Sequence, residues 1–341
     1  MTRDSVETDA RPDGPKIGVL LFNLGGPERL EDVRPFLYNL FSDREIINLP
    51  AVFRIPLAAF IAFTRGPKSR GYYAKIGGGS PLRRDTEAQG RALEQALAAR
   101  GIPARAYVGM RAWNPFIDEA VDAMQRDGIR EAVVLPLYPH FSVSTTGSST
   151  KELYRVVTKR GGVRDMRRRY ITRWFDDPGY IDAVARRIEE QLPKFPDPGS
   201  VHLLFTAHSI PLSYIERGDP YQRHTERTVE LVRERLGLPL EHSLAYQSKV
   251  GPVKWLAPST ESQIRALGER GESQVLAIPI SFVSDHIETL YEIDILYRDL
   301  AAEAGITHFR RTEALGLDPG FIDSLAALVE RRLGRGRNGD A

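Results

Sequence analysis

The segments AVVLPLYPHFS (132–142) and VLAIPISFVSD (275–285) each begin with an apolar run that contains a proline and is followed by an aromatic residue and a serine. Short runs that are apolar throughout, rather than alternating, are typical of strands covered on both faces of a sheet. Each segment follows a helical pattern, and that pattern follows a strand pattern with Ala-Tyr at 106–107 or 245–246. The repeat predicts two similar halves, with chance similarity between two buried strands as the alternative.

Strand and helix patterns alternate along the rest of the chain. Further strand patterns cover 16–24, 104–110, 201–207 and 243–247. A helical pattern with one apolar face is formed by Ile181, Val184, Ala185, Ile188 and Leu192. This alternation predicts parallel sheets covered by helices, arranged as two Rossmann-like halves. Ligands of such sheets bind beyond the carboxyl ends of the strands, so functional residues are expected directly after strands.

The composition is that of a folded protein of about two domains. The chain has 341 residues, of which 42% are hydrophobic and 27% charged, and one ordinary core seldom organises so long a chain. The net charge of +2 gives no reason to expect a nucleic-acid partner. The basic residues cluster at Arg164, Arg167, Arg168, Arg169 and Arg173. We interpret this cluster as a solvated face.

The chain contains no cysteine. Disulfides, thiolate catalysis and cysteine-ligated iron–sulfur clusters are therefore excluded for these residues. Any metal ion must be bound by His, Asp, Glu or carbonyl oxygen.

Residues 1–15 mix charged residues and proline without an apolar core, so we expect a flexible lead-in rather than a signal peptide. We also expect a flexible tail at 336–341. No apolar run approaches the roughly 18 residues of a membrane-spanning helix. The nearest candidate, AVFRIPLAAFIAF (51–63), is short and is interrupted by Arg54 and Pro56.

His208 directly follows the apolar strand pattern VHLLFTA (201–207) and precedes Ser-Ile-Pro. A single histidine at a strand end is more often a structural hydrogen-bonding residue than a catalytic one. Its position at the expected ligand-binding crevice favours a catalytic role.

The segment SDHIETLYEID (284–294) also follows a predicted strand. In an α-helix that begins here, Asp285, Glu288 and Glu292 lie on one face. One interpretation is a capped helix whose acidic residues favour its positive N-terminal end. The other is a line of oxygen ligands that passes a divalent metal ion inward. The pattern alone favours neither.

Two glycine- and hydroxyl-rich loops have free N–H groups that could bind an anion. They are Gly77–Gly79 before Ser80, and Thr145–Ser149 after the strand pattern that ends near Tyr138. Neither matches the phosphate-binding loop or the dinucleotide fingerprint. We therefore expect carboxylate binding rather than nucleotide binding.

Seven local strings together resemble the motif series of the ferrochelatases, in the order of that family and over nearly the whole chain. They are LLFNLGGP (20–27), IGGGSP (76–81), STTGSS (144–149), TAHSIP (206–211), RGDPY (217–221), QSKVGP (247–252) and SDHIETLYEID (284–294). The resemblance implies the class II chelatase fold, an α/β fold of two Rossmann-like domains whose parallel four-stranded sheets face a central cleft.

The resemblance also implies a set of site residues. The histidine of the family's AHS string matches His208, and the glutamate of its HIE string matches Glu288, so these are the expected catalytic pair. The expected metal-handling residues are His208, Glu288, Asp285 and Glu292. The expected porphyrin contacts are Leu24, Arg65, Tyr73, Ser80, Arg111, Tyr138 and Trp255. Phe60 and Phe63 are expected on an apolar lip of the cleft.

Three departures from the family pattern are visible. Leu24 stands where other members have Met, which affects contact with the macrocycle. Leu296 replaces an acidic residue found in some relatives, which puts the far end of any metal path in doubt. The cysteine-bound cluster of some relatives is not expected here.

The expected activity is insertion of Fe²⁺ into protoporphyrin IX to give protohaem, the last step of haem biosynthesis, with no permanently bound cofactor. A neutral imidazole suits the removal of pyrrole protons, and a carboxylate can hold Fe²⁺ or accept a proton; which of His208 and Glu288 does which stays open. The alternatives are a non-catalytic haem or porphyrin carrier and a cobalt or nickel chelatase of the same fold.

We expect an N-terminal domain of residues 16–172 plus 311–335, which includes a returning C-terminal helix, and a C-terminal domain of residues 173–310. An apolar lip on 51–63 predicts peripheral contact with a membrane surface, with a helix buried between the domains as the alternative. The expected location is the cytoplasm at the inner membrane, with transient contact to the preceding enzyme of the haem pathway.

Overall fold

The computed structural model describes residues 17–159 and 166–334. The expected lead-in 1–15, the expected tail 336–341 and Arg164 lie outside the described residues.

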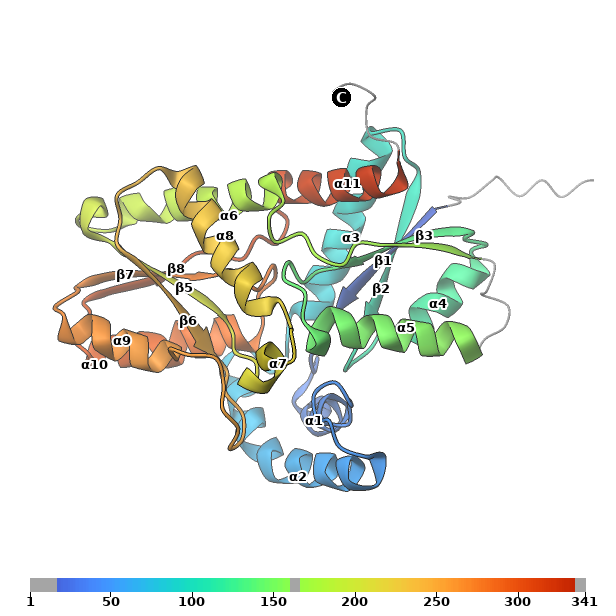
Figure 1. Cartoon of the computed structure of the whole chain (residues 1–341), viewed down its shortest axis with the longest axis horizontal. Helices are drawn as coiled ribbons and strands as arrows, with labels where there is room; N and C mark the ends of the chain where they lie inside the picture. Colours follow the sequence, from blue (N-terminus) through green and yellow to red (C-terminus); the bar gives the residue numbers. More distant parts are fainter. Residues whose placement is uncertain (1–16, 160–165, 335–341) are drawn as a thin grey trace, which may run out of the picture.

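The chain forms two parallel four-stranded sheets with the same topology (Figure 1). The first sheet has the order β2-β1-β3-β4, from β1 (Ile17–Asn23), β2 (Ala104–Met110), β3 (Glu131–Pro136) and β4 (Arg167–Tyr170). The second has the order β6-β5-β7-β8, from β5 (His202–His208), β6 (His242–Gln247), β7 (Gln274–Pro279) and β8 (His308–Arg311). The two repeat segments form β3 and β7, which occupy equivalent places. The predicted fold class is confirmed.

Helices cover both faces of each sheet. The helices of the first half, of which α1 and α2 pack mainly on each other, are α1 (Val33–Phe41), α2 (Ala51–Lys75), α3 (Leu82–Ala99), α4 (Ile117–Arg126), a π-helix (Val143–Gly147) and α5 (Ser148–Lys159). The later elements are α6 (Pro178–Gln191), α7 (Leu212–Glu216), α8 (Tyr221–Leu236), α9 (Thr260–Glu269), a second π-helix (Glu288–Tyr297), α10 (Arg298–Glu303) and α11 (Pro319–Leu333). Single 3₁₀ turns lie at Leu30–Asp32, Leu192–Lys194 and Pro198–Ser200.

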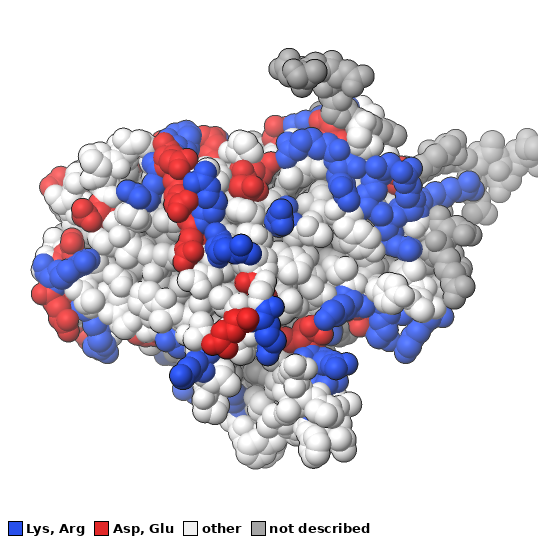
Figure 2. Space-filling view, in the orientation of Figure 1, with Lys and Arg blue, Asp and Glu red and all other residues white. Residues whose placement is uncertain are grey.

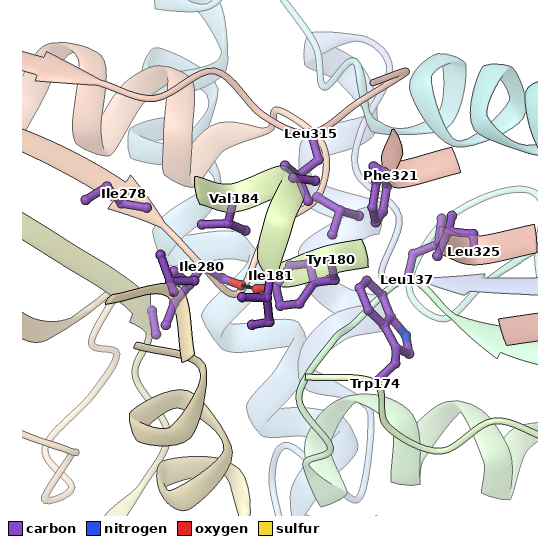
Figure 3. Close-up of a cluster of buried hydrophobic side chains, with 14 of the residues drawn as sticks. Leu137, Trp174, Tyr180, Ile181, Val184, Ile278, Ile280, Leu315, Phe321 and Leu325 are labelled. Atoms are coloured by element: carbon purple, nitrogen blue, oxygen red, sulfur yellow. Dashed lines mark hydrogen bonds between the residues drawn. The ribbon is translucent and has the colours of Figure 1, made fainter. Parts of the chain in front are cut away.

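One large apolar core joins the two sheets, and its centre is shown in Figure 3. The indole N–H of Trp174 donates to the carbonyl of Pro136 at the end of β3 (2.8 Å), and the hydroxyl of Tyr180 donates to the carbonyl of Ile280 just after β7 (2.6 Å). These two buried aromatic residues therefore hold the carboxyl ends of both sheets in fixed relation. Smaller cores cover the outer face of each sheet.

The helix α11 packs on both α3 and α6. Arg100 at the end of α3 pairs with Glu330 of α11 (2.6 Å). The residue boundaries of the two domains stay a prediction.

The edge strand β4 carries Arg167, Arg168 and Arg169, three residues of the predicted basic cluster. Arg167 is 70% exposed, and Arg169 pairs with Glu131 of β3 (2.6 Å). Charged residues on an edge strand oppose pairing with another chain, so the location fits a solvated face.

Apolar side chains of α2 are exposed. Exposed fractions are 71% for Val52, 63% for Phe53, 64% for Phe60 and 66% for Phe63. The alternative of a helix buried between the domains is therefore wrong. Figure 2 shows the projection formed by α1 and α2 as a mostly uncharged surface with basic residues at its margin. No helix in the described ranges is long and apolar enough to cross a membrane.

The LGGP segment (24–27) and the segment Gly77–Ser80 pack against each other. A Cβ at Gly79 would lie 2.0 Å from the backbone oxygen of Glu28, which follows the LGGP string, and a Cβ at Gly26 would lie 2.7 Å from the side chain of Ser80. Backbone cannot give way as a flexible side chain can, so Gly79 is required by this close approach.

We expect Gly79→Ala to lower the free energy of unfolding by about 3 kcal/mol, because the new methyl group meets fixed backbone. Urea unfolding followed by circular dichroism measures it. The matched control is Gly71→Ala in the exposed part of α2, where nothing lies within 4 Å of the new Cβ; it should gain up to about 1 kcal/mol from helix propensity. Equal stability of Gly79→Ala and the wild type would contradict this account.

Candidate active site

His208 is the last residue of β5, at the carboxyl edge of the second sheet. Its backbone N–H donates to Ser281 Oγ (3.0 Å), and its Nδ1 lies 2.8 Å from Glu288 Oε2. The side chain of His208 is 38% exposed while that of Glu288 is 14% exposed. The ring is thus fixed on one side by a carboxylate and remains reachable on the other.

Glu288 begins the second π-helix, and Glu292 lies one turn later. The hydroxyl of Ser248 lies 2.8 Å from Glu288 Oε2 and 2.6 Å from Glu292 Oε2. The side-chain amide of Gln247 donates to Glu292 Oε2 (3.1 Å) and to the backbone oxygen of Glu288 (3.0 Å). The end of β6 therefore holds the two carboxylates beside His208.

Ser248 adopts a left-handed backbone conformation with φ 69°. Non-glycine residues pay of the order of 1 kcal/mol or more for this region, and such residues concentrate at functional sites. Here the conformation directs the hydroxyl to both carboxylates. Sequence reasoning did not single out Ser248 or Gln247, although both lie in the QSKVGP string.

The charges in this cluster shift one another's pKa values. Burial raises the pKa of Glu288, but the interaction with His208 and the contribution of His286 outweigh it, so the pKa lies well below its usual range. Burial lowers the pKa of His208, and the charges of Glu288 and Glu292 raise it above its ordinary value. Burial and the charge of Glu288 raise the pKa of Glu292 to about 7. The site therefore combines an ionised Glu288 carboxylate with a Glu292 carboxyl group close to its titration point at neutral pH.

Asp285 does not share this cluster. It precedes the π-helix, and its carboxylate pairs with Arg311 (2.9 Å) and accepts a hydrogen bond from Thr289 (2.9 Å). Arg311 also binds Asp294 through two bonds of 2.8 Å. The expected α-helical face of Asp285, Glu288 and Glu292 is wrong, because the segment from Glu288 is a π-helix with a wider turn. The assignment of Asp285 as a metal ligand stays a prediction, and its ion pair weighs against it.

Three of the predicted porphyrin contacts lie near the pair. Leu24 and Tyr73 pack in one apolar cluster with Ile287, the neighbour of Glu288. Burial and the charge of Glu288 raise the pKa of Tyr73. Trp255 pairs in an isolated bridge with Pro211, three residues after His208, and its indole N–H is buried with no partner among the described residues.

The other predicted contacts have no hydrogen bond or ion pair with His208 or Glu288 among the described residues. Arg111 binds Ser148 Oγ (2.7 Å) and Asp43 Oδ2 (3.1 Å), which joins three segments of the first half. Arg65 is exposed on α2, whereas Ser80 and Tyr138 are partly buried. In residues 17–159 and 166–334, no hydrogen bond or ion pair links these last three to His208 or Glu288.

In the two loops expected to bind an anion, several amides are occupied. The N–H groups of Gly77 and Gly78 donate to carbonyls at the end of α2, and that of Ser80 donates to Pro27 (2.7 Å). In the Thr145–Ser149 loop, the N–H groups of Thr145 and Gly147 donate to the carbonyl of Ser142 (3.3 and 3.0 Å). Backbone carbonyls of the chain therefore accept from several of these amides, which weighs against the expected anion binding; that binding stays a prediction.

Within the described residues, no group of three or more His, Cys, Asp or Glu side chains is arranged to hold a metal ion.

Comparison with known proteins agrees with these features. The family model described as Ferrochelatase matches residues 16–333. A ferrochelatase of Gloeobacter violaceus is 54% identical over 321 residues, which cover 94% of this chain and 98% of that protein. Chloroplastic ferrochelatase-2 of Arabidopsis thaliana is 51% identical, with 93% of this chain and 64% of that protein covered.

Among solved structures, the sirohydrochlorin chelatase SirB from Bacillus subtilis subspecies spizizenii, in complex with cobalt, superimposes with a TM-score of 0.56 and 12% identity. The match covers 94% of this chain and 96% of that one. At this identity the likeness concerns the fold alone. The family match over nearly the whole chain and the 54% identity to a curated relative show that this chain belongs to the ferrochelatase family, the lyase-type chelatases that form protohaem.

Proposed function

We propose that this chain inserts Fe²⁺ into protoporphyrin IX and that His208 and Glu288 are the reacting pair. The observation that carries the proposal is the 2.8 Å hydrogen bond between His208 Nδ1 and Glu288 Oε2. Insertion replaces two pyrrole protons by Fe²⁺, so the site must accept protons while it admits a dication. A histidine held by a carboxylate suits the first task.

His208 acts as the base. Because the lowered pKa of Glu288 keeps its carboxylate ionised, Glu288 accepts a hydrogen bond and the proton of a neutral imidazole lies on Nδ1. Nε2 is then free to accept a pyrrole proton. The carboxylate orients the ring and stabilises the imidazolium that forms, as the acidic member of a catalytic triad does.

Glu292 extends this pair. With a pKa of about 7, its carboxyl group exchanges protons readily at neutral pH. Ser248 bridges it to Glu288 through hydrogen bonds of 2.6 and 2.8 Å. We assign Glu292 and Glu288 the handling of the incoming Fe²⁺ and of the released protons, because carboxylate oxygen is an acceptable ligand for this ion.

The porphyrin is proposed to bind where Leu24, Tyr73 and Trp255 approach the pair. These side chains supply apolar and aromatic contacts to a flat macrocycle and exclude water from the reacting nitrogens. The exposed Arg65 is the proposed partner of the propionates, since a guanidinium binds carboxylates through two parallel hydrogen bonds.

Two other functions predict different behaviour. A porphyrin carrier would bind protoporphyrin without converting it, and a cobalt or nickel chelatase would prefer another metal or tetrapyrrole. Both are distinguished by mixing the protein with protoporphyrin and Fe²⁺ without oxygen and following the porphyrin absorption bands.

We expect His208→Ala to keep protoporphyrin binding and to lose at least about 100-fold in the rate of iron insertion, because the base is removed. Glu288→Gln should also slow insertion strongly, since the amide cannot stabilise the imidazolium. Stopped-flow absorption under anaerobic conditions measures the rate, and fluorescence quenching measures porphyrin binding.

The control for this experiment is His308→Ala, which changes an exposed histidine at the start of β8. It should insert iron at the wild-type rate. Turnover of His208→Ala at that same rate would falsify the assignment of the base.

A second prediction concerns the pKa of His208. Because its folded-state pKa is raised, His208 contributes stability that is fully present below the ordinary pKa of histidine and is lost as the pH rises through the raised value. Glu288→Gln removes the main cause of the rise while burial persists, so the pKa of His208 should fall by about one unit or more. NMR titration of the ring protons measures it, with His208→Ala to assign the signal. An unchanged pKa in Glu288→Gln would show that the pair does not interact.

We also propose that the exposed apolar face of α2 rests on a membrane surface, and that the protein acts in the cytoplasm at the inner membrane. Four apolar side chains of this face are each more than three-fifths exposed, which supports contact with a membrane. The surface helix of a soluble protein usually exposes far less apolar area. Arg54 and Arg65 lie on the same helix and suit an anionic lipid surface. Such a location places the protein where the preceding enzyme of the pathway could transfer a poorly soluble porphyrin.

We expect Phe60→Asp combined with Phe63→Asp to weaken binding to anionic vesicles at least about tenfold, because the apolar contact is replaced by like charge. Sedimentation with vesicles of phosphatidylglycerol and phosphatidylcholine measures it. The matched control is Tyr154→Asp on α5, which changes a side chain that is 73% exposed. Equal partitioning of the double variant and the control would rule out contact through α2.

A further inference from the structure

A cavity of about 600 Å³ lies where the two halves of the molecule meet, apart from the residues of the proposed active site. Its walls come from the loop after α1, the Val143–Gly147 π-helix with the start of α5, and α7 with the residue that follows it. No residue predicted to contact porphyrin lines it. Its volume is within the range of small-molecule sites.

The walls carry an excess of positive charge. Arg44, Lys151 and Arg217 face one carboxylate, that of Glu45. Lys151 pairs with Glu45 at 2.8 Å. Arg44 and Arg217 form no ion pair in the part of the chain that the structure describes, and the guanidinium of Arg217 stacks over the ring of Tyr214 at 5.1 Å. Two guanidinium groups, one from each half, are therefore available to a ligand.

Hydrogen bonds fix both sides of the cavity. The hydroxyl of Tyr214 donates to the carbonyl of Glu45 (2.6 Å), which ties the second half to the loop after α1. The backbone N–H of Glu45 donates to Asp43 Oδ1 (2.9 Å), and the buried carboxylate of Asp43 also forms an ion pair with Arg111. On the other wall, the carboxylate of Asp219 accepts a hydrogen bond from the backbone N–H of Val143. A site built on restrained segments loses little entropy when a ligand binds.

We propose that this cavity binds a small organic anion with at least two carboxylate or phosphate groups. Arg44 and Arg217 each take one acidic group, since guanidinium groups bind such groups through charge-assisted, paired hydrogen bonds. Tyr214 and Val143 supply the apolar contact. The concave shape fits a small molecule rather than the acidic surface of a protein. The site is independent of the proposed iron insertion.

The test is isothermal titration calorimetry of the full chain with citrate and with inorganic phosphate. We expect citrate to bind with a Kd of about 1 mM or lower and more tightly than phosphate, because two groups engage two guanidiniums. Arg44→Gln combined with Arg217→Gln should weaken citrate binding at least about tenfold. Glu45→Gln should tighten it, because the competing carboxylate is removed and Lys151 is released.

The matched control is Arg84→Gln combined with Arg298→Gln, which removes the same charge from exposed arginines elsewhere. It should bind citrate as the wild type does, and circular dichroism checks that every variant is folded. The proposal is overturned if the wild type binds no citrate at about 10 mM, or if the Arg44/Arg217 variant binds as well as the control. It is also overturned if Arg65→Gln abolishes binding, since that would place the anion at the proposed propionate site.

Discussion

The hydrogen bond between His208 Nδ1 and Glu288 Oε2 is the interaction on which the chemistry of this protein depends. Its two partners belong to different segments, the end of β5 and the start of the second π-helix. In this mostly buried setting the ionised carboxylate orients the imidazole and stabilises the imidazolium that forms when His208 accepts a proton. The pair leaves one imidazole nitrogen free, and Ser248 extends it to Glu292. The fold therefore delivers a base, an oriented carboxylate and a second carboxyl group with a pKa of about 7 to one edge of one sheet.

The position of that edge relative to the first half depends on the shared apolar core. Trp174 and Tyr180 bind the chain at the ends of β3 and β7, the two strands that carry the sequence repeat. Because both contacts are buried within one packed cluster, the two carboxyl edges cannot shift independently. Leu24 and Tyr73, from the first half, can then meet Ile287 from the second. The walls proposed for the porphyrin are thus a consequence of how the halves are joined.

Much of this arrangement could be predicted from the sequence. The apolar runs and their repeat predicted two parallel sheets, and the rule that ligands bind beyond strand ends selected His208 and the segment that contains Glu288. Asp285 was grouped with Glu288 and Glu292 on the assumption of α-helical spacing, whereas the π-helix begins at Glu288 and leaves Asp285 with Arg311. The glycine and STTGSS loops had a suitable composition for anions, but backbone carbonyls accept from several of their amides. Contacts between segments far apart in sequence, such as Ser248 with both glutamates, leave no periodic signal that a single sequence can reveal.

The most direct test of the central claim is a crystal structure of the protein with metal-free protoporphyrin, grown without divalent metal ions. We expect a macrocycle beside Leu24, Tyr73 and Trp255, with a pyrrole nitrogen within about 3 Å of His208 Nε2 and with Glu288 still hydrogen-bonded to Nδ1. A macrocycle whose nitrogens lie beyond the reach of both His208 and Glu288 would contradict it.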